Sequence, residues 1–223
     1  MKIGALWDWD GVVIDSSRQH EKSWERLAEE EGKPLPVDHF LRGFGKKNSV
    51  IIPGILQWTE DPEEIQRMSL RKEELYREIL KEPDEEPRLI PGVLHFIQLL
   101  SEAGFPNVVG TSTERENVRV ITEHFGFHEH LTGIIASEDV SEGKPDPEVF
   151  LKAAERAGLA PGSCVVFEDS LHGLEAGLGG GMKVVGVATT QPAEVLQEKG
   201  AHAVIPDFQS VDLEFLKNLF SHA

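Results

Sequence analysis

The fold of this chain can first be recognised in residues 3–11, which read Ile3-Gly4-Ala5-Leu6-Trp7-Asp8-Trp9-Asp10-Gly11. The first five residues are apolar, a pattern typical of a strand buried in a parallel sheet. Asp8 and Asp10 then follow, and carboxylates are almost never buried unless they are paired or bind a metal. Because side chains alternate along a strand, both carboxylates can face one side and form a hard-oxygen site of the kind magnesium prefers. The alternative is a simple acidic turn, since Asp-Gly is a common turn pair.

The composition is that of an ordinary globular protein with an acidic balance. The 223 residues are 39% hydrophobic and 27% charged, and they suffice for one large domain or two modest ones. The net charge of −17 argues against nucleic acid or an anionic membrane surface as a main partner. Residues 16–90 hold 13 of the 22 Lys and Arg but only 17 of the 39 acidic residues, so the basic side chains are concentrated in this segment.

The sequence also bears on the compartment in which the protein works. Cys164 is the only cysteine, which excludes an intrachain disulfide. Asp8 and Asp10 interrupt the apolar run that a signal peptide would need. No apolar run approaches the length of a membrane span. We therefore expect a cytoplasmic protein without a membrane partner.

Two regions with different patterns follow the first strand. After Ser16 the spacing of apolar residues is helical up to about residue 81, with breaks expected at residues 43–45 and 53–54, and residues 82–87 form a charged, proline-containing linker. Beyond it, strands expected at 107–110, 133–136, 164–167, 183–187 and 204–205 alternate with helices at 116–125, 147–157, 171–178 and 211–220. The sequence therefore predicts an α/β fold, in which residues 1–15 and 88–223 form a Rossmann-like, doubly wound parallel sheet and residues 16–87 an inserted α-helical cap domain.

Polar residues gather where the expected strands end. Ligands bind beyond the carboxyl ends of the strands in open α/β sheets. Besides the first strand, three others deliver candidates there: Thr111-Ser112, a loop with Lys144, and Glu168-Asp169. Four carboxylates, a pair of hydroxyls and one lysine are thus expected at one edge of the sheet, which random polar loops would seldom produce.

These residue types suit phosphoryl transfer through a covalent aspartyl intermediate. Asp8 is the candidate nucleophile, and Asp10 can protonate the leaving oxygen and later deprotonate a water. Magnesium bound by Asp8, Asp169 and a backbone carbonyl at Asp10 would screen the repulsion between carboxylate and phosphate. Lys144 and Thr111 would hold the phosphoryl oxygens. The pocket would then be locally positive in an acidic protein.

The same residues resemble the four motifs of a known superfamily. Asp8-Trp9-Asp10-Gly11-Val12, Thr111, Gly143-Lys144-Pro145-Asp146-Pro147 and Glu168-Asp169-Ser170 are similar to those of the haloacid dehalogenase-like hydrolases, most of all to their β-phosphoglucomutase and sugar-phosphatase branch. The resemblance covers nearly the whole chain, cap included. It implies Asp8 as nucleophile, Asp10 as acid and base, Thr111 and Lys144 as phosphate ligands, and Glu168 with Asp169 at a Mg²⁺ site. It also implies a small phosphorylated metabolite as substrate, and a monomer.

The cap offers further candidates for binding the substrate. His20 matches a histidine that faces the active site in β-phosphoglucomutases; the alternative is a polar residue beside Trp24 on a helix face. The segment Arg42-Gly43-Phe44-Gly45-Lys46-Lys47-Asn48 can form a tight basic loop that reads the far end of the substrate, or it can hold ordinary surface lysines. The candidate substrate-binding residues are Gly11, His20, Arg42, Lys46, Asn48 and Ser112.

Three functions remain open from the sequence. Around residues 113–117 the chain looks more like the phosphatases than the mutases, so a magnesium-dependent phosphatase is favoured. A phosphosugar mutase shares the first half-reaction but needs a second phosphate site and must exclude water. A catalytically silent binding protein is disfavoured because Asp8, Asp10, Lys144 and Asp169 are all present.

Overall fold

The computed structural model describes residues 2–43 and 45–221, and the chain forms two compact units. The core unit comprises Met1–Asp15 and Leu89–Ala223, and the cap unit comprises Ser16–Arg88. Strands β2 (Ile14–Asp15) and β3 (Arg88–Leu89) pair where the chain passes between the units. No helix in the described part of the chain is long and apolar enough to cross a membrane.

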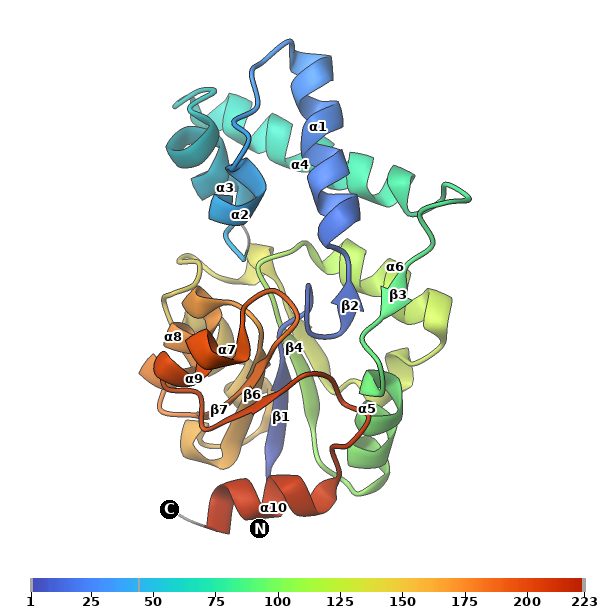
Figure 1. Cartoon of the computed structure of the whole chain (residues 1–223), viewed down its shortest axis with the longest axis vertical. Helices are drawn as coiled ribbons and strands as arrows, with labels where there is room; N and C mark the ends of the chain where they lie inside the picture. Colours follow the sequence, from blue (N-terminus) through green and yellow to red (C-terminus); the bar gives the residue numbers. More distant parts are fainter. Residues whose placement is uncertain (1, 44, 222–223) are drawn as a thin grey trace. The chain divides into compact units, whose positions relative to one another are not determined.

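Six parallel strands form the sheet of the core unit, in the order β5-β4-β1-β6-β7-β8 (Figure 1). They are β1 (Gly4–Trp7), β4 (Asn107–Gly110), β5 (Gly133–Ile135), β6 (Cys164–Glu168), β7 (Lys183–Val187) and β8 (Ala203–Ile205). The predicted doubly wound α/β fold is confirmed. The chain moves outward from β1 through β4 to β5 and then returns to the other side of β1 with β6. The strand order therefore reverses between β1 and β6, which is where open α/β sheets bind ligands.

Helices cover both faces of this sheet (Figure 1). The helical segments of the core unit are α5 (Val93–Glu102), α6 (Arg115–Phe125), α7 (Glu148–Ala157), α8 (Leu171–Gly179), α9 (Ala193–Glu198) and α10 (Leu213–Ser221), with short 3₁₀ turns at His128–His130, Ser137–Asp139 and Pro161–Ser163. Leu6 and Val166 belong to the apolar cluster that α7 and α8 complete. Their neighbours Trp7 and Phe167 point to the other face, where they stack 4.6 Å apart and meet Phe96 of α5. Burial on both faces explains why these strands are continuous apolar runs.

The described residues of the cap unit form helices, as the sequence predicts. The segments are α1 (Ser17–Glu31), α2 (His39–Gly43), α3 (Asn48–Val50), the π-helical run η1 (Ile51–Leu56) and α4 (Pro62–Ile79). Trp24 of α1 and the α4 residues Met68 and Leu75 share one apolar core. The break expected at residues 53–54 is wrong, because Pro53 and Gly54 lie inside η1, which continues directly from α3.

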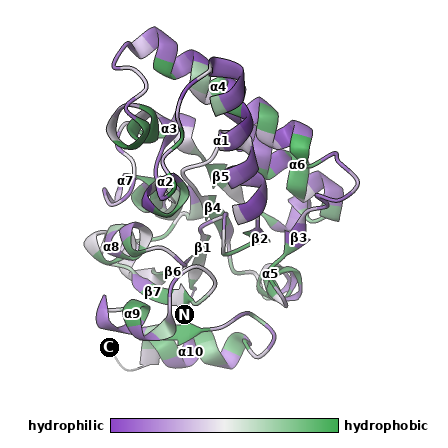
Figure 2. Ribbon diagram, turned by 45° about the horizontal axis from the view of Figure 1, so that its top comes forward, coloured by the Kyte–Doolittle hydropathy of each residue, from purple (hydrophilic) through white to green (hydrophobic). Residues whose placement is uncertain are grey.

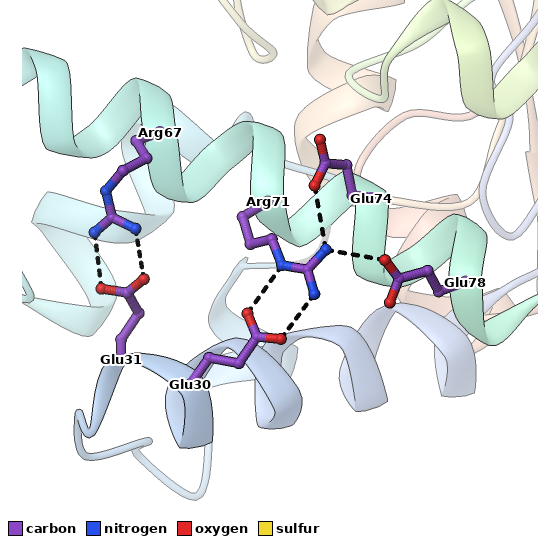
Figure 3. A network of polar contacts seen from close by, with 6 residues as sticks. All are labelled: Glu30, Glu31, Arg67, Arg71, Glu74 and Glu78. Atoms are coloured by element: carbon purple, nitrogen blue, oxygen red, sulfur yellow. Dashed lines mark hydrogen bonds and ion pairs between the residues drawn. The ribbon is translucent and has the colours of Figure 1, made fainter.

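Ion pairs join α1 to α4 on the surface of the cap unit (Figure 3). Arg67 makes two hydrogen bonds to Glu31, at 2.6 and 2.8 Å. Arg71 makes two to Glu30, at 2.9 and 2.8 Å, and also bonds two glutamates of its own helix. Both helices are coloured mostly as hydrophilic in Figure 2. Part of the basic charge in this segment therefore belongs to a solvated helix surface.

Candidate active site

A tight turn after β1 holds Asp8 and Asp10 at the carboxyl end of the sheet. The carbonyl of Trp9 accepts hydrogen bonds from the amides of residues 12–14, at 3.3, 2.9 and 3.1 Å, so the chain folds back directly after the strand. The amide of Asp8 donates to the carbonyl of Phe167 at 3.0 Å. This bond joins the turn to β6, on the side of β1 where the strand order reverses.

Lys144 lies buried between two carboxylates that come from different strands. Its Nζ donates to Oδ1 of Asp8 at 2.6 Å and to Oε1 of Glu168 at 2.7 Å. It also lies 4.8 Å from the centroid of the Phe150 ring, at the start of α7. Burial alone would lower the pKa of the Lys144 ammonium, but its attraction to Asp8 and Glu168 outweighs burial and raises that pKa above its usual value. The lysine is therefore a fixed positive charge.

Asp169 follows β6 and is packed from two directions. Its Oδ2 accepts a hydrogen bond of 2.6 Å from the hydroxyl of Thr190. On another side lies the backbone of Gly11, whose φ is +83°, and a Cβ at that position would be only 2.0 Å from Oδ2. Only glycine fits there, because other residues rarely adopt this backbone conformation and would collide with the carboxylate. The other oxygen of Asp169, Oδ1, is buried and has no hydrogen-bond partner among the described residues.

The donor set fits a divalent cation. In the described part of the chain, one group of three or more potential ligands lies close enough to share a metal: Asp8, Glu168 and Asp169, with one oxygen each within 4.8 Å of the others. Burial raises the pKa of Asp8 to about 7 although Lys144 acts against it. Burial and the charges of Glu168 and Asp8 raise the pKa of Asp169 well above its usual value. One ammonium thus fails to balance three buried carboxylates, and an oxygen-only set with excess negative charge suits Mg²⁺.

Three other core candidates lie in the segments that follow β1 and its neighbour β4. Thr111 is buried at the end of β4, and its Oγ1 accepts a hydrogen bond from the amide of Thr113 at 3.1 Å, so its own proton remains for another acceptor. Ser112 is half-buried beside it. Asp10 is half-buried, and its charge contributes to the raised pKa of Asp8. Its carboxylate is not in the ligand group, and the expected role of its backbone carbonyl stays a prediction.

Two of the cap candidates meet in one buried polar cluster of the cap unit. Nζ of Lys72 lies 2.6 Å from Nδ1 of His20, and since an ammonium only donates, the imidazole accepts. Lys72 also donates to Glu73 at 2.9 Å, and Nδ2 of Asn48 donates to the same carboxylate at 2.7 Å. The His20 ring stacks on Tyr76 with centroids 4.0 Å apart. The positive charge of Lys72 is therefore matched by a carboxylate within the cluster.

The remaining cap candidates are not joined to this cluster by any hydrogen bond among the described residues. Arg42 is exposed and lies 3.6 Å from Asp38, one turn earlier. Lys46 is half-buried, and its amide donates to the carbonyl of Gly43. Phe44, from the same expected loop, lies outside the described residues.

Two residues that shape the cap cluster and the active site, Lys72 and Gly173, were not predicted from the sequence. Lys72 had a usable signal, because it falls on the apolar stripe of α4 that includes Met68, Leu75 and Tyr76, and a lysine on such a stripe needs a partner. Gly173 had one too, since glycine inside a helix is unfavourable unless space demands it. A Cβ there would lie 1.6 Å from Oε1 of Glu168.

The chain belongs to the haloacid dehalogenase-like hydrolase family, whose model matches residues 4–181. Its relatives place it in the β-phosphoglucomutase and sugar-phosphatase branch. It is 34% identical to the chloroplast 5-amino-6-(5-phospho-D-ribitylamino)uracil phosphatase of Arabidopsis thaliana over 97% of this chain, and it spans 57% of that protein. It is 27% identical to the β-phosphoglucomutase of Bacillus subtilis, over 95% of this chain and 92% of that protein. Other relatives are named as phosphatases of phosphorylated carbohydrates or of fructose 1-phosphate.

A solved structure supports the same assignment. A family IA hydrolase of Entamoeba histolytica matches with a TM-score of 0.86 and 28% identity, over 99% of both chains. The predicted superfamily and branch are therefore confirmed.

Proposed function

We propose that this protein is a magnesium-dependent phosphatase that hydrolyses a small phosphorylated metabolite, of the sugar-phosphate type, through an aspartyl-phosphate intermediate. That it is a phosphoric monoester hydrolase follows from its family and from its several phosphatase relatives. The observation that carries the finer proposal is the buried Lys144, bonded at once to Asp8 and Glu168 next to Asp169. A cytoplasmic location and a monomeric state stay predictions.

In the first step, a carboxylate oxygen of Asp8 attacks phosphorus, and the bond between phosphorus and the leaving oxygen breaks. Asp10 gives its proton to that oxygen. In the second step, Asp10 takes a proton from a water, the water oxygen attacks phosphorus, and the bond between phosphorus and Asp8 breaks to release phosphate. Lys144 and the hydroxyl of Thr111 bind the phosphoryl oxygens, whose charge is greatest in the transition states.

Mg²⁺, held by Asp8, Asp169 and the backbone carbonyl of Asp10 with Glu168 beside them, would supply positive charge that screens the repulsion between the nucleophile and the phosphate. Glu168 also has a role that needs no metal. By accepting a bond from Lys144 at 2.7 Å, it orients the ammonium toward Asp8. Gly11 allows the Asp8–Asp10 turn to approach Asp169 closely.

The second candidate function is a phosphosugar mutase, because a β-phosphoglucomutase is among the relatives. The cap cluster favours the phosphatase. A mutase must bind a second phosphate, whereas the charge of Lys72 is already matched by Glu73 at 2.9 Å. A neutral polar cluster is suited to hydroxyl groups, and His20 and Asn48 remain our candidates for binding the part of the substrate that is not phosphorylated.

The test is an assay of the purified chain with Mg²⁺ against a panel of hexose, pentose and polyol phosphates, following released phosphate and isomerised sugar phosphate in parallel. We expect phosphate release that requires Mg²⁺ and is abolished in Asp8→Asn. Isomerisation that depends on added sugar bisphosphate, with little phosphate released, would establish the mutase instead. Retained turnover in Asp8→Asn would refute the assignment of Asp8 as the nucleophile. No turnover of any ester would favour a binding protein.

A further inference from the structure

Two adjacent threonines after β7 tie together two loops of the active site. The hydroxyl of Thr189 donates to the carbonyl of Gly11 at 2.6 Å. The hydroxyl of Thr190 donates to Oδ2 of Asp169 at 2.6 Å and lies 3.1 Å from the carbonyl oxygen of the same residue. Gly11 is 178 residues away along the chain and Asp169 is 21 residues away. The segment after β7 therefore links the turn after β1 to the end of β6.

The bond from Thr190 decides which oxygen of Asp169 remains for a ligand. A carboxylate group can rotate about its terminal bond and exchange its two oxygens. With the hydroxyl donating to Oδ2, that oxygen is occupied and the plane of the group is fixed. Oδ1 is then the oxygen left buried without a hydrogen-bond partner among the described residues. Because buried polar atoms are nearly always paired, an unpaired one within a cluster of three carboxylates indicates a position for a cation.

The backbone of Gly11 also limits the position of this carboxylate. A Cβ on Gly11 would be 2.0 Å from Oδ2 and 2.7 Å from Cγ of Asp169, so the glycine is in close contact with this group. The Thr189 hydroxyl holds the carbonyl of Gly11, and with it the peptide bond between Gly11 and Val12. Thr190 thus holds Asp169 directly, and Thr189 holds the glycine that lies against it.

We propose that Thr190 is a positioning residue for the divalent cation: it holds Oδ2 of Asp169 so that Oδ1 faces the cation. Thr189 supports it by fixing Gly11, against which the carboxylate packs. The proposal rests on the proposed magnesium site and goes beyond it by assigning a role to residues outside the four motifs. Groups that orient metal ligands in this way typically change metal affinity by about 10- to 100-fold when removed.

The test measures Mg²⁺ binding to the full chain by isothermal titration calorimetry without substrate. In Thr190→Val, which keeps the shape but loses the donor, we expect the Mg²⁺ dissociation constant to rise about 10-fold. In Thr190→Ser, which keeps the donor, it should stay within about twofold of the unmodified chain. In activity assays, the Mg²⁺ concentration for half-maximal rate should rise with the dissociation constant in Thr190→Val, while kcat at saturating Mg²⁺ stays nearly unchanged, because the ligand set itself is intact.

Thr122→Val is the matched control. Thr122 is a buried threonine of α6 whose hydroxyl donates to the carbonyl of Arg119 at 3.0 Å. Its loss should lower thermal stability but leave the Mg²⁺ dissociation constant unchanged. If Thr190→Val does not fold by circular dichroism, Thr190→Ala takes its place.

Equal Mg²⁺ affinity in Thr190→Val and the unmodified chain would overturn the role of Thr190, as would a Thr190→Ser variant that binds as weakly as Thr190→Val. Failure of the phosphatase proposal gives a different result. The unmodified chain would then bind Mg²⁺ and hydrolyse no phosphate ester, while the comparison of affinities among the variants still decides the role of Thr190. An unmodified chain that binds no Mg²⁺ would overturn both proposals.

Discussion

Replacing Gly173 with alanine is expected to damage the active site, although the same change inside a helix ordinarily stabilises a protein. Gly173 is the third residue of α8 and is buried. The added Cβ would lie 1.6 Å from Oε1 and 1.9 Å from Cδ of Glu168, whereas real Cβ atoms essentially never come closer than 3.0 Å to another heavy atom. Glu168 must therefore withdraw by at least about 1.4 Å, the difference between 3.0 and 1.6 Å, or α8 must move away from β6.

This displacement acts directly on the bonds that Glu168 makes. Oε1 is the atom that accepts from Lys144 at 2.7 Å, and Oε2 accepts from the amide of Ser170 at 2.6 Å. Breaking a buried ion pair by loss of one partner costs about 3–5 kcal/mol, while alanine in place of a helical glycine contributes about 1 kcal/mol. We expect a net loss of about 2–4 kcal/mol in the free energy of unfolding. A displacement of this size at a catalytic group also lowers kcat by about 100-fold.

The assay pairs phosphate release at saturating Mg²⁺ and substrate with urea unfolding at pH 7. Gly179→Ala is the matched control, because Gly179 ends the same helix and a Cβ there meets nothing within 4 Å. It should keep full activity and equal or slightly exceed the unmodified chain in stability. The reasoning is refuted if Gly173→Ala behaves like Gly179→Ala in both measurements, because Glu168 would then not be held where the structure has it.

Two substitutions and one change of pH test how charged groups contribute to activity and stability in the two units. Lys144→Met should lower kcat by about 100- to 1,000-fold, as is typical when one preorganised electrostatic group is lost, measured at saturating Mg²⁺. With EDTA present, the stability of the unmodified chain should fall as pH rises from about 4 through 7. The reason is that the pKa of Asp8 is raised from 3.8 to about 7 in the folded chain, so the folded chain binds more protons than the unfolded one in that range. Mg²⁺ should remove this fall, and urea midpoints at pH 5 and 8 measure both effects. Arg71→Met should cost the cap unit at most about 1 kcal/mol, since its ion pairs with Glu30 and its helical neighbours are partly exposed (Figure 3), and high salt should reduce the difference from the unmodified chain.

The sheet could be predicted because its signals are local. A strand buried on both faces must be an apolar run, and the run from Cys164 to Phe167 can be read without knowing what surrounds it. The gathering of Asp8, Lys144 and Glu168 then follows from one geometric rule, that parallel strands end at the same edge. The structure brings these side chains within hydrogen-bond distance across 136 and 24 residues.

The rest depends on where the atoms of a neighbour lie, which a local pattern does not contain. Thr190 is an ordinary loop residue until Asp169 is found 2.6 Å from its hydroxyl. Gly173 is simply an unfavourable helix residue until the structure shows that the Glu168 side chain occupies the place of a Cβ at this position. Lys72 resembles any helical lysine until His20 and Glu73 are placed beside it. Pro53 predicts a helix break, but it lies inside the π-helical run Ile51–Leu56.

The charge of the site explains how so acidic a chain can act on an anion. Among the described residues, the buried ammonium of Lys144 bonds Asp8 and Glu168, and the carboxylate of Asp169 lies in the same group. Charges that lie close together in buried surroundings are weakly screened and interact strongly. The charge that a phosphate meets is therefore set by these four groups and the proposed cation, and hardly by the net charge of −17. Any residue that orients Asp169 toward the cation therefore helps to determine the sign of the electric charge in the pocket. On this reasoning Thr190 acts on the charge of the pocket through the affinity for the cation, whereas Lys144 supplies its charge directly.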